Sequence, residues 1–174
     1  MTVQASDQFL LDGRTYEIID GLGAGLVYPK RLGLEPVGAS SACWRGYVST
    51  YSLQGEQLVL ENLDVCLYDM QRRAYEPLVG HEINGIQPRT RHGEFALFNN
   101  EYVGIRLPAP YTGSLVIADD VVDAAWTIGW PFPPWAYRTV VELFFFRGRR
   151  FFSRSWNYHA LVLRFLSFKW ERLK

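Results

Sequence analysis

The residue types that most often do chemistry are sparse in this chain of 174 residues, which holds three histidines and two cysteines. His81 and His92 each have a glutamate close by. Neighbouring side chains on a strand point to opposite faces, so only His92 and Glu94 would share one. The spacings H-x-H, H-E-x-x-H and C-x-x-C, which are typical of metal sites, do not occur. We therefore expect no metal centre and no cofactor.

Carboxylates and nucleophiles form no catalytic pattern either. The aspartates of segment 119–123 lack the regular alternation and the glycine of a calcium loop. No serine stands in a G-x-S-x-G elbow. On a strand, Arg45 would share a face with Cys43 and lower the pKa of its thiol, although a small buried side chain is the simpler interpretation. An enzyme that uses His92, Glu94 or the aspartates is the least favoured function.

Aromatic residues make up 16% of the chain, and several stand where they could bind a ligand. In the stretch Trp-Pro-Phe-Pro-Pro-Trp, prolines stiffen a loop while Trp130, Phe132 and Trp135 supply flat faces for stacking on a sugar or entering a partner's pocket. The alternative is that these rings fold back and close one end of a barrel. A second set of candidate binding residues is Trp44, Arg45 and Tyr47.

Charge is balanced over the whole chain but divided along it. Residues 1–137 hold 9 Lys and Arg against 16 Asp and Glu, whereas residues 138–174 hold 9 against 2. With no net charge overall, we expect no nucleic-acid partner. The basic residues alternate with phenylalanines between 144 and 154, which predicts a strand pair with one wet face. That region either packs on the acidic body or faces a partner.

The elements that must position these residues are predicted to be mainly strands. Asp12-Gly13 and Arg147-Gly148 each separate apolar runs, as the turns of tight hairpins do. Within 43–69 two long strands flank a turn at 54–56, and a change of parity in the second predicts a β-bulge near Glu61-Asn62. The glycines of 21–25 lack the spacing of a phosphate-binding loop, so we interpret them as a connector. Further strands are expected at 82–86, 94–98, 102–107, 114–118 and 125–129.

The fold class is therefore mainly β, an antiparallel barrel or sandwich of about ten short strands. One helix is expected at 158–172, where Asn157 can cap a stripe of apolar side chains and basic residues suit the last turn. The length fits one domain over 1–174. No apolar stretch is long enough for a membrane span or a secretory signal, so we expect a cytoplasmic protein.

Two segments resemble a known protein family. Cys43-Trp44-Arg45-Gly46-Tyr47, together with Leu107-Pro108-Ala109-Pro110-Tyr111-Thr112-Gly113, looks like an uncharacterised family of bacterial proteins over about residues 7–142. This resemblance implies a bacterial, single-domain, cytoplasmic protein. It carries no catalytic residues to this chain.

The function that these observations favour is a non-enzymatic binding protein with a protein partner, such as an immunity-like neutraliser of a toxin. The acidic 1–137 region would then face a basic toxin, with aromatic anchors beside it. The alternative is a barrel that holds a small apolar or glycan ligand in an interior cavity lined by Tyr and Trp. For the cysteines we expect two neighbouring free thiols, Cys43 and Cys66, because a reducing compartment gives no disulfide.

Overall fold

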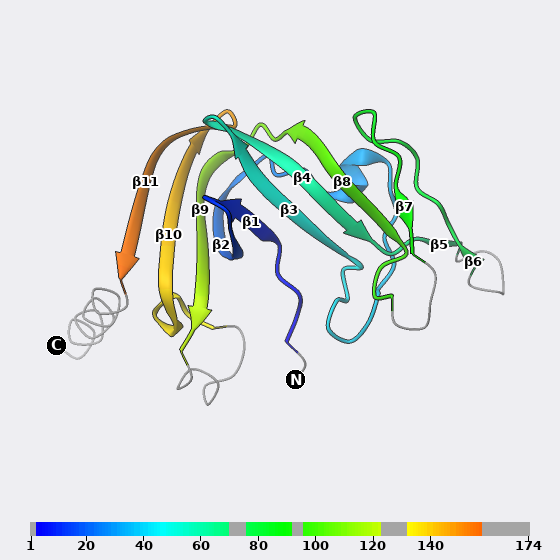
Figure 1. The fold of residues 1–174 in the computed structure, drawn as a ribbon, viewed down its shortest axis with the longest axis horizontal. Coiled ribbons are helices and arrows are strands. Elements are labelled where there is room, and N and C mark those ends of the chain that lie inside the picture. Colours follow the sequence, from blue (N-terminus) through cyan, green and yellow to red (C-terminus); the bar gives the residue numbers. More distant parts are fainter. Residues whose placement is uncertain (1–2, 70–75, 92–95, 123–131, 158–174) are drawn as a thin grey trace.

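Strands dominate the computed structural model, which describes residues 3–69, 76–91, 96–122 and 132–157 (Figure 1). The strands are β1 Gln8–Leu11, β2 Arg14–Ala24, β3 Tyr47–Gln54, β4 Gln57–Val65, β5 Tyr68–Asp69, β6 Glu76–Pro77, β7 Arg89–Thr90, β8 Asn100–Pro108, β9 Thr112–Val121, β10 Tyr137–Phe146 and β11 Arg149–Asn157. Two short 3-10 helices, η1 Pro29–Leu32 and η3 Pro134–Ala136, interrupt them. The mainly β prediction is confirmed. The helix predicted at 158–172 lies outside the described residues.

Nine of the strands form one mixed sheet in the order β11-β10-β9-β2-β1-β3-β4-β8-β7, and β5 pairs with β6 separately. The prediction of a purely antiparallel sheet is wrong at one place, because β1 runs parallel to β3. The excursion through η1 carries the chain across from β2 to the far side of β1, where β3 begins. Among the described residues, no helix is long and apolar enough to cross a membrane.

The sheet is strongly curved, and its two slopes meet near the turns of the β3–β4 and β10–β11 hairpins (Figure 1). There Arg149 of β11 pairs with Gln57 of β4. Gly148 N donates to Tyr111 O at 2.7 Å, and Leu58 N donates to Gly148 O at 2.7 Å. The segment between β8 and β9 therefore joins both hairpins, which gives the residues around Tyr111 a structural role.

Both predicted hairpin turns and the predicted bulge are confirmed. Asp12-Gly13 connects β1 to β2 and Arg147-Gly148 connects β10 to β11, each with positive φ at both turn residues. This is the backbone of the two-residue turns that match strand twist. In β4, Thr50 faces Asn62 while Tyr51 faces Leu60, which leaves one extra residue at position 61.

Four local predictions are wrong. The glycine-rich segment 21–25 was expected to be a connector, but residues 21–24 belong to a strand, because β2 continues to Ala24. A Cβ on Gly23 would lie 2.7 Å from Cζ of Tyr111, so the missing side chain makes room for that ring. The strand expected from Cys43 begins only at Tyr47. Residues 82–86 form a turn with one bridge between Ile83 and Ile86, and 96–98 form no strand. The strand predicted at 125–129 lies outside the described residues.

The main core lies between the two slopes of the sheet. It contains fully buried side chains from strands on both slopes, among them Tyr51, Leu63, Tyr102, Ile117 and Phe145. The hydroxyl groups of its tyrosines are satisfied, since Tyr51 donates to Val27 O at 2.7 Å and Tyr102 donates to His81 O at 2.8 Å. Burial raises the pKa of Tyr102 to about 12. These side chains fill the concave face of the sheet.

A second, smaller core covers part of the opposite face of β9 and β10. Val140 belongs to it, whereas its neighbour Val141 belongs to the main core. Because side chains alternate along a strand, the two cores lie on opposite faces of β10. Phe132 and Ala136, which precede β10, are buried in this second core. Farther along β10, past Glu142, the same face has no such cover from the described residues.

Candidate functional site

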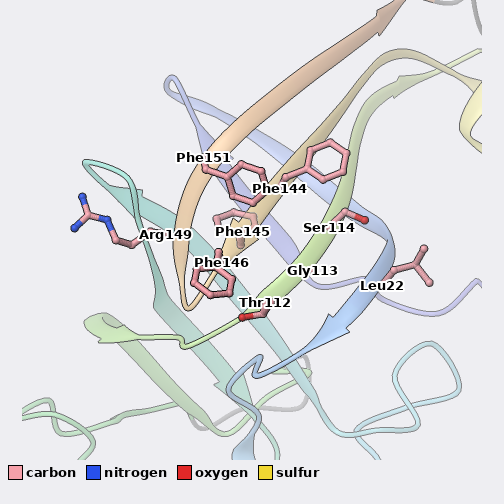
Figure 2. A pocket seen from close by; sticks show the side chains of 9 residues that line it. All are labelled: Leu22, Thr112, Gly113, Ser114, Phe144, Phe145, Phe146, Arg149 and Phe151. Carbon is pink, nitrogen blue, oxygen red and sulfur yellow. The ribbon is translucent and has the colours of Figure 1, made fainter.

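Five large apolar side chains gather on the uncovered end of that outer face, and we call them the aromatic face: Leu22, Phe144, Phe146, Phe151 and Phe152. Figure 2 shows the first four of them. Their exposure is high for such side chains, at 74% for Leu22, 59% for Phe146, 69% for Phe151 and 52% for Phe152. Single exposed apolar residues are ordinary, whereas a contiguous group is typical of surfaces that bind another molecule.

The strand register aligns these side chains in one row across four strands. Leu22 of β2 lies opposite Ser114 of β9, which lies opposite Phe144 of β10, which in turn lies opposite Phe152 of β11. Only Ser114 in this row is small. Because the Ser114 side chain is short, the surface is lower there than at the leucine and the phenylalanine rings on either side.

A bulge in β11 adds a further ring to the face. Phe144 pairs with Phe152 but Phe145 pairs with Arg150, so Phe151 is the extra residue. The ring centroid of Phe151 lies 6.3 Å from the ring centroid of Phe144. The ring centroid of Phe152 lies 5.5 Å from the ring centroid of Phe144. The bulge thus places two consecutive phenylalanines around the same neighbour.

The rings surround an open depression of about 770 Å³. Besides the apolar side chains, Thr112, Gly113, Ser114 and Arg149 line it (Figure 2). This volume is of the size that binding sites use, but the depression is open along one side of the sheet. It suits an apolar group that arrives on the surface of a larger molecule.

Arginines flank the aromatic face at the β10–β11 turn. The Arg147 guanidinium lies 5.3 Å from the centroid of the Phe146 ring. Neither Arg147 nor Arg149 forms an ion pair with a carboxylate in the described ranges. By contrast, Arg150 binds Glu56 at 2.7 Å and Arg154 binds Glu142 at 2.6 Å.

The basic region is therefore divided in its contacts. The Arg150 hydrogen bonds lower the pKa of Glu56 and raise the pKa of Arg150. Part of the basic region 138–174 thus packs on acidic groups of residues 1–137, as one of the two hypotheses from the sequence predicts. Arg147 and Arg149 fit the other hypothesis, in which the region faces a partner.

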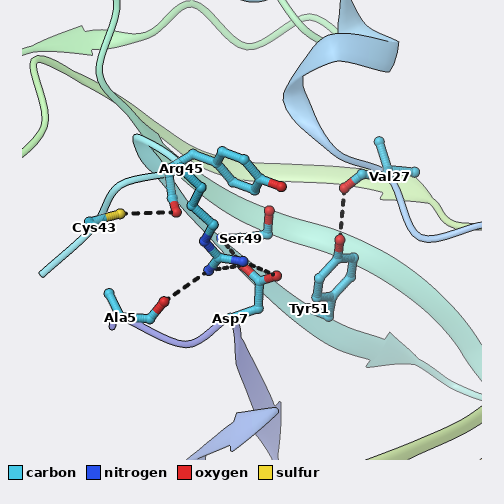
Figure 3. A network of polar contacts seen from close by, with 8 residues as sticks. Ala5, Asp7, Val27, Cys43, Arg45, Ser49 and Tyr51 are labelled. Carbon is cyan, nitrogen blue, oxygen red and sulfur yellow. Dashed lines mark hydrogen bonds and ion pairs between the residues drawn. The ribbon is translucent and has the colours of Figure 1, made fainter. Parts of the chain in front are cut away.

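The second candidate set forms a polar network that ties the N-terminal segment to β3 (Figure 3). Arg45 donates to both carboxylate oxygens of Asp7, at 2.9 and 2.8 Å, and to Ala5 O at 3.2 Å. Asp7 also accepts from Ser49 N at 2.7 Å. The guanidinium lies 4.7 Å from the centroid of the Tyr47 ring. Burial opposes the charge on Arg45, but Asp7 outweighs it, so the pKa of Arg45 is raised.

These contacts give Arg45 and Tyr47 a structural role, and Tyr47 is only partly exposed. Burial is also the largest cause that raises the pKa of Tyr47. Trp44 differs from them, since 72% of it is exposed while its backbone N–H donates to Gln4 Oε1 at 3.1 Å. Of this set, Trp44 alone offers a ring to a partner.

The loop that the sequence singled out lies only partly within the described residues, and Trp130 lies outside them. Phe132 is 9% exposed and packs edge-on against Tyr137, with the ring centroids 6.3 Å apart. Trp135 is partly buried against the same second core. The described rings of this loop fold back on the sheet, which was the alternative interpretation.

The candidate catalytic groups are not brought together in the described part of the chain. There, no three His, Cys, Asp or Glu side chains lie close enough to hold a metal ion. Asp120 forms an ion pair with Arg138 at 3.4 Å. His92 and Glu94 lie outside the described residues.

The two cysteines lie in the interior of the protein. Cys43 and Cys66 are both buried and free, as expected. Burial first, and then Cys43, raises the pKa of the Cys66 thiol. The two thiols are close enough to interact, and both lie just outside the paired strands, because Cys43 precedes β3 and Cys66 follows β4.

Sequence reasoning missed the aromatic face although a signal was present. Phe144, Phe145 and Phe146 are consecutive on a strand, and a period of two places the middle ring opposite the outer two. Phe145 is buried in the main core, so the other two had to lie on the outer face. The row with Leu22 needed the pairing of β2 with β9, which joins segments far apart in sequence.

Comparison with known proteins adds no constraint on this site. No protein-family model, curated protein or solved structure matches the chain. The resemblance to an uncharacterised bacterial family stays an expectation.

Proposed function

We propose that this chain is a non-enzymatic binding protein that holds a protein partner through the aromatic face. The observation that carries the proposal is the exposure of Phe146, Phe151 and Phe152 side by side on one sheet face, next to Leu22. Each exposed ring loses contact with water when a partner covers it, and aromatic anchors dominate the affinity of protein interfaces. Apolar rings with an arginine rim are typical of such surfaces.

The charge around the aromatic face favours an acidic partner. Arg147 and Arg149 lie beside the rings, and neither forms an ion pair with a carboxylate among the described residues, although the charge of Arg149 helps to lower the pKa of the nearby Glu56. An immunity-like role against a basic toxin would instead use the acidic body as the docking surface. We therefore infer a partner whose contact surface combines apolar and acidic side chains.

A second candidate function is the binding of a small apolar ligand in the depression. Its volume of about 770 Å³ favours this alternative, as does its lining of phenylalanine and leucine. A glycan is less favoured, because Thr112, Ser114 and Arg149 supply few polar groups. The interior cavity expected for a ligand-binding barrel has no support, since the concave tyrosines are buried in the main core.

Two further expectations belong to the proposal. The curvature of the sheet and the pairing of Arg149 with Gln57 support a partly open barrel as its architecture. The two buried free thiols support a reducing, cytoplasmic compartment for the protein and its partner.

Affinity capture from cells that produce the protein tests the proposal. The bait is the full chain as wild type, as the double variant Phe146→Ser with Phe151→Ser, and as Val79→Ser. Val79 is 66% exposed and lies outside the aromatic face, so it is the matched control. We expect one protein to be enriched by the wild type and the control and lost from the double variant.

The recovered protein is then purified and mixed with each bait, so that a direct contact is separated from an indirect one. Equal capture by all three baits would assign the contact to another surface. An apolar small molecule recovered from the wild type alone, in place of a protein, would establish the second candidate function.

A further inference from the structure

Strand β11, which carries two rings of the aromatic face, is also an edge of the nine-stranded sheet. One side of β11 pairs with β10 along its length. On its other side, Arg149 pairs with Gln57 and Arg150 N donates to Glu56 O at 2.7 Å. Over residues 151–155 no strand in the described ranges pairs with that side.

An open edge presents unpaired backbone N–H and C=O groups, which another extended chain can bind. Proteins protect such edges with very short strands, prolines, β-bulges or charged side chains. Residues 151–155 contain no proline, their bulge lies at one end, at Phe151, and their one charged residue, Arg154, is paired with Glu142 of β10. At the far end of the sheet, β7 has only two residues. The long open edge is the one that adjoins the exposed rings.

We propose that the partner is recognised by β-strand addition, in which an extended acidic segment pairs with residues 151–155 of β11. This inference rests on the proposed function and specifies the kind of partner. Backbone hydrogen bonds to β11 would give affinity, and alternate side chains of the added strand would give specificity. Every second side chain would lie on the outer face, beside Phe152.

Charge favours an acidic segment over a second copy of this chain. A segment that extends past Phe151 toward the turn reaches Arg149 and Arg147. A copy of β11 would bring its own arginines to the same edge, where like charges on neighbouring strands destabilise the pair. Acidic side chains at the end of an apolar segment neutralise these arginines instead.

A designed peptide tests the inference without knowledge of the natural partner. The probe is the acetylated, amidated peptide Glu-Thr-Val-Thr-Val-Thr-Glu, in which valines and glutamates share one face of a strand. Its matched control has lysine in place of glutamate. We expect the glutamate peptide to bind the full-length protein at least about tenfold more tightly than the lysine peptide. The double variant Arg147→Glu with Arg149→Glu should reverse that preference.

Backbone methylation separates strand addition from simple surface contact. In a strand, the N–H groups of alternate residues point to opposite edges, so valine and threonine amides face different sides. One peptide is N-methylated on both valines and another on two threonines. We expect one of them to bind like the parent peptide and the other at least about tenfold more weakly. NMR should place the changes in amide shift on β11.

The remaining outcomes overturn the inference in distinguishable ways. Equal affinity of the two methylated peptides, with binding still lost in Phe151→Ser, would reject strand addition and leave the aromatic face as the binding surface. Peptide binding that is unchanged in Phe151→Ser would count against the proposed function as well. Binding to vesicles of phosphatidylglycerol and phosphatidylcholine, with no peptide bound, would reject the inference in favour of a membrane surface.

Discussion

Single charged residues in this protein differ in whether they hold the fold together or stand at the surface proposed to bind a partner. Arg45 and Asp7 are mutually bonded and only partly exposed, with side-chain exposures of 34% and 20%. Arg147 and Arg149, in contrast, stand beside exposed rings. The first pair stabilises the attachment of the N-terminal segment to β3, whereas the second pair is positioned to meet an incoming molecule.

Arg45→Ala tests the structural role of the network in Figure 3. The substitution leaves the Asp7 carboxylate without its bidentate partner in a half-buried place, which should cost about 2 kcal/mol of unfolding free energy after allowance for solvent screening. Urea denaturation measures it. The control Arg106→Ala removes an arginine that is 67% exposed and 3.6 Å from Glu61, and should cost less than about 0.5 kcal/mol. Equal stability of the two variants would contradict the assigned role.

Glu56 gives a pH dependence with a defined sign. Hydrogen bonds from Arg150 lower its pKa from the ordinary value of 4.5. A pKa that is lower in the folded state stabilises the fold above the unfolded pKa, and this stability is lost as the pH falls through the folded pKa. Below about pH 4.5, wild-type stability should therefore decrease more steeply than that of Glu56→Gln. If the unfolding free energies of the two proteins fell in parallel as the pH decreased, the Glu56–Arg150 pair would contribute nothing to stability.

Among the elements, β2 and β11 account for most of what was difficult to predict. The hairpin turns and the bulge at position 61 follow from local patterns, and the structure has them. The glycines of β2 were mistaken for a connector, because the atoms that require them belong to Tyr111, Thr112 and Leu115, about 90 residues away in sequence. The aromatic face had the same difficulty, since its row depends on pairing β2 with β9. Contacts between distant strands leave no local pattern.

Gly23→Ala tests the close approach of β2 to Tyr111 and Thr112. Its Cβ would meet the backbone oxygen of Thr112 first and lie 2.7 Å from Tyr111 Cζ, so a strand or the ring must shift, at a cost of about 1–3 kcal/mol. In Gly21→Ala the nearest atom is Leu115 Cδ2 at 3.1 Å, the end of a side chain that can adjust. We expect a clearly smaller loss of unfolding free energy there. The reverse order would mean that Tyr111 does not constrain β2.

At the scale of the whole molecule, one curved sheet presents two different faces to its surroundings. The concave face is filled by the main core, and part of the outer face is covered by the second core. Among the described residues, the aromatic face is what remains open beside the edge strand β11. The proposed function thus assigns stability and binding to different faces of the same strands.

This separation predicts opposite behaviour for neighbouring phenylalanines. Phe145→Ala removes a ring that is 1% exposed and should cost about 3–5 kcal/mol. Phe151→Ser removes a ring that is 69% exposed and should change the unfolding free energy by less than about 0.5 kcal/mol. Chemical denaturation of both variants checks this. A large loss in Phe151→Ser would mean that the aromatic face is part of the fold and not a free surface.

The most direct measurement is the dissociation constant of the captured partner for purified wild type, Phe151→Ser and Val79→Ser. If the aromatic face is the binding surface, Phe151→Ser should weaken binding by about 30-fold or more, as loss of a central aromatic anchor does. Val79→Ser should bind like the wild type, and all three proteins should unfold at the same denaturant concentration. Equal dissociation constants for wild type and Phe151→Ser would contradict the account.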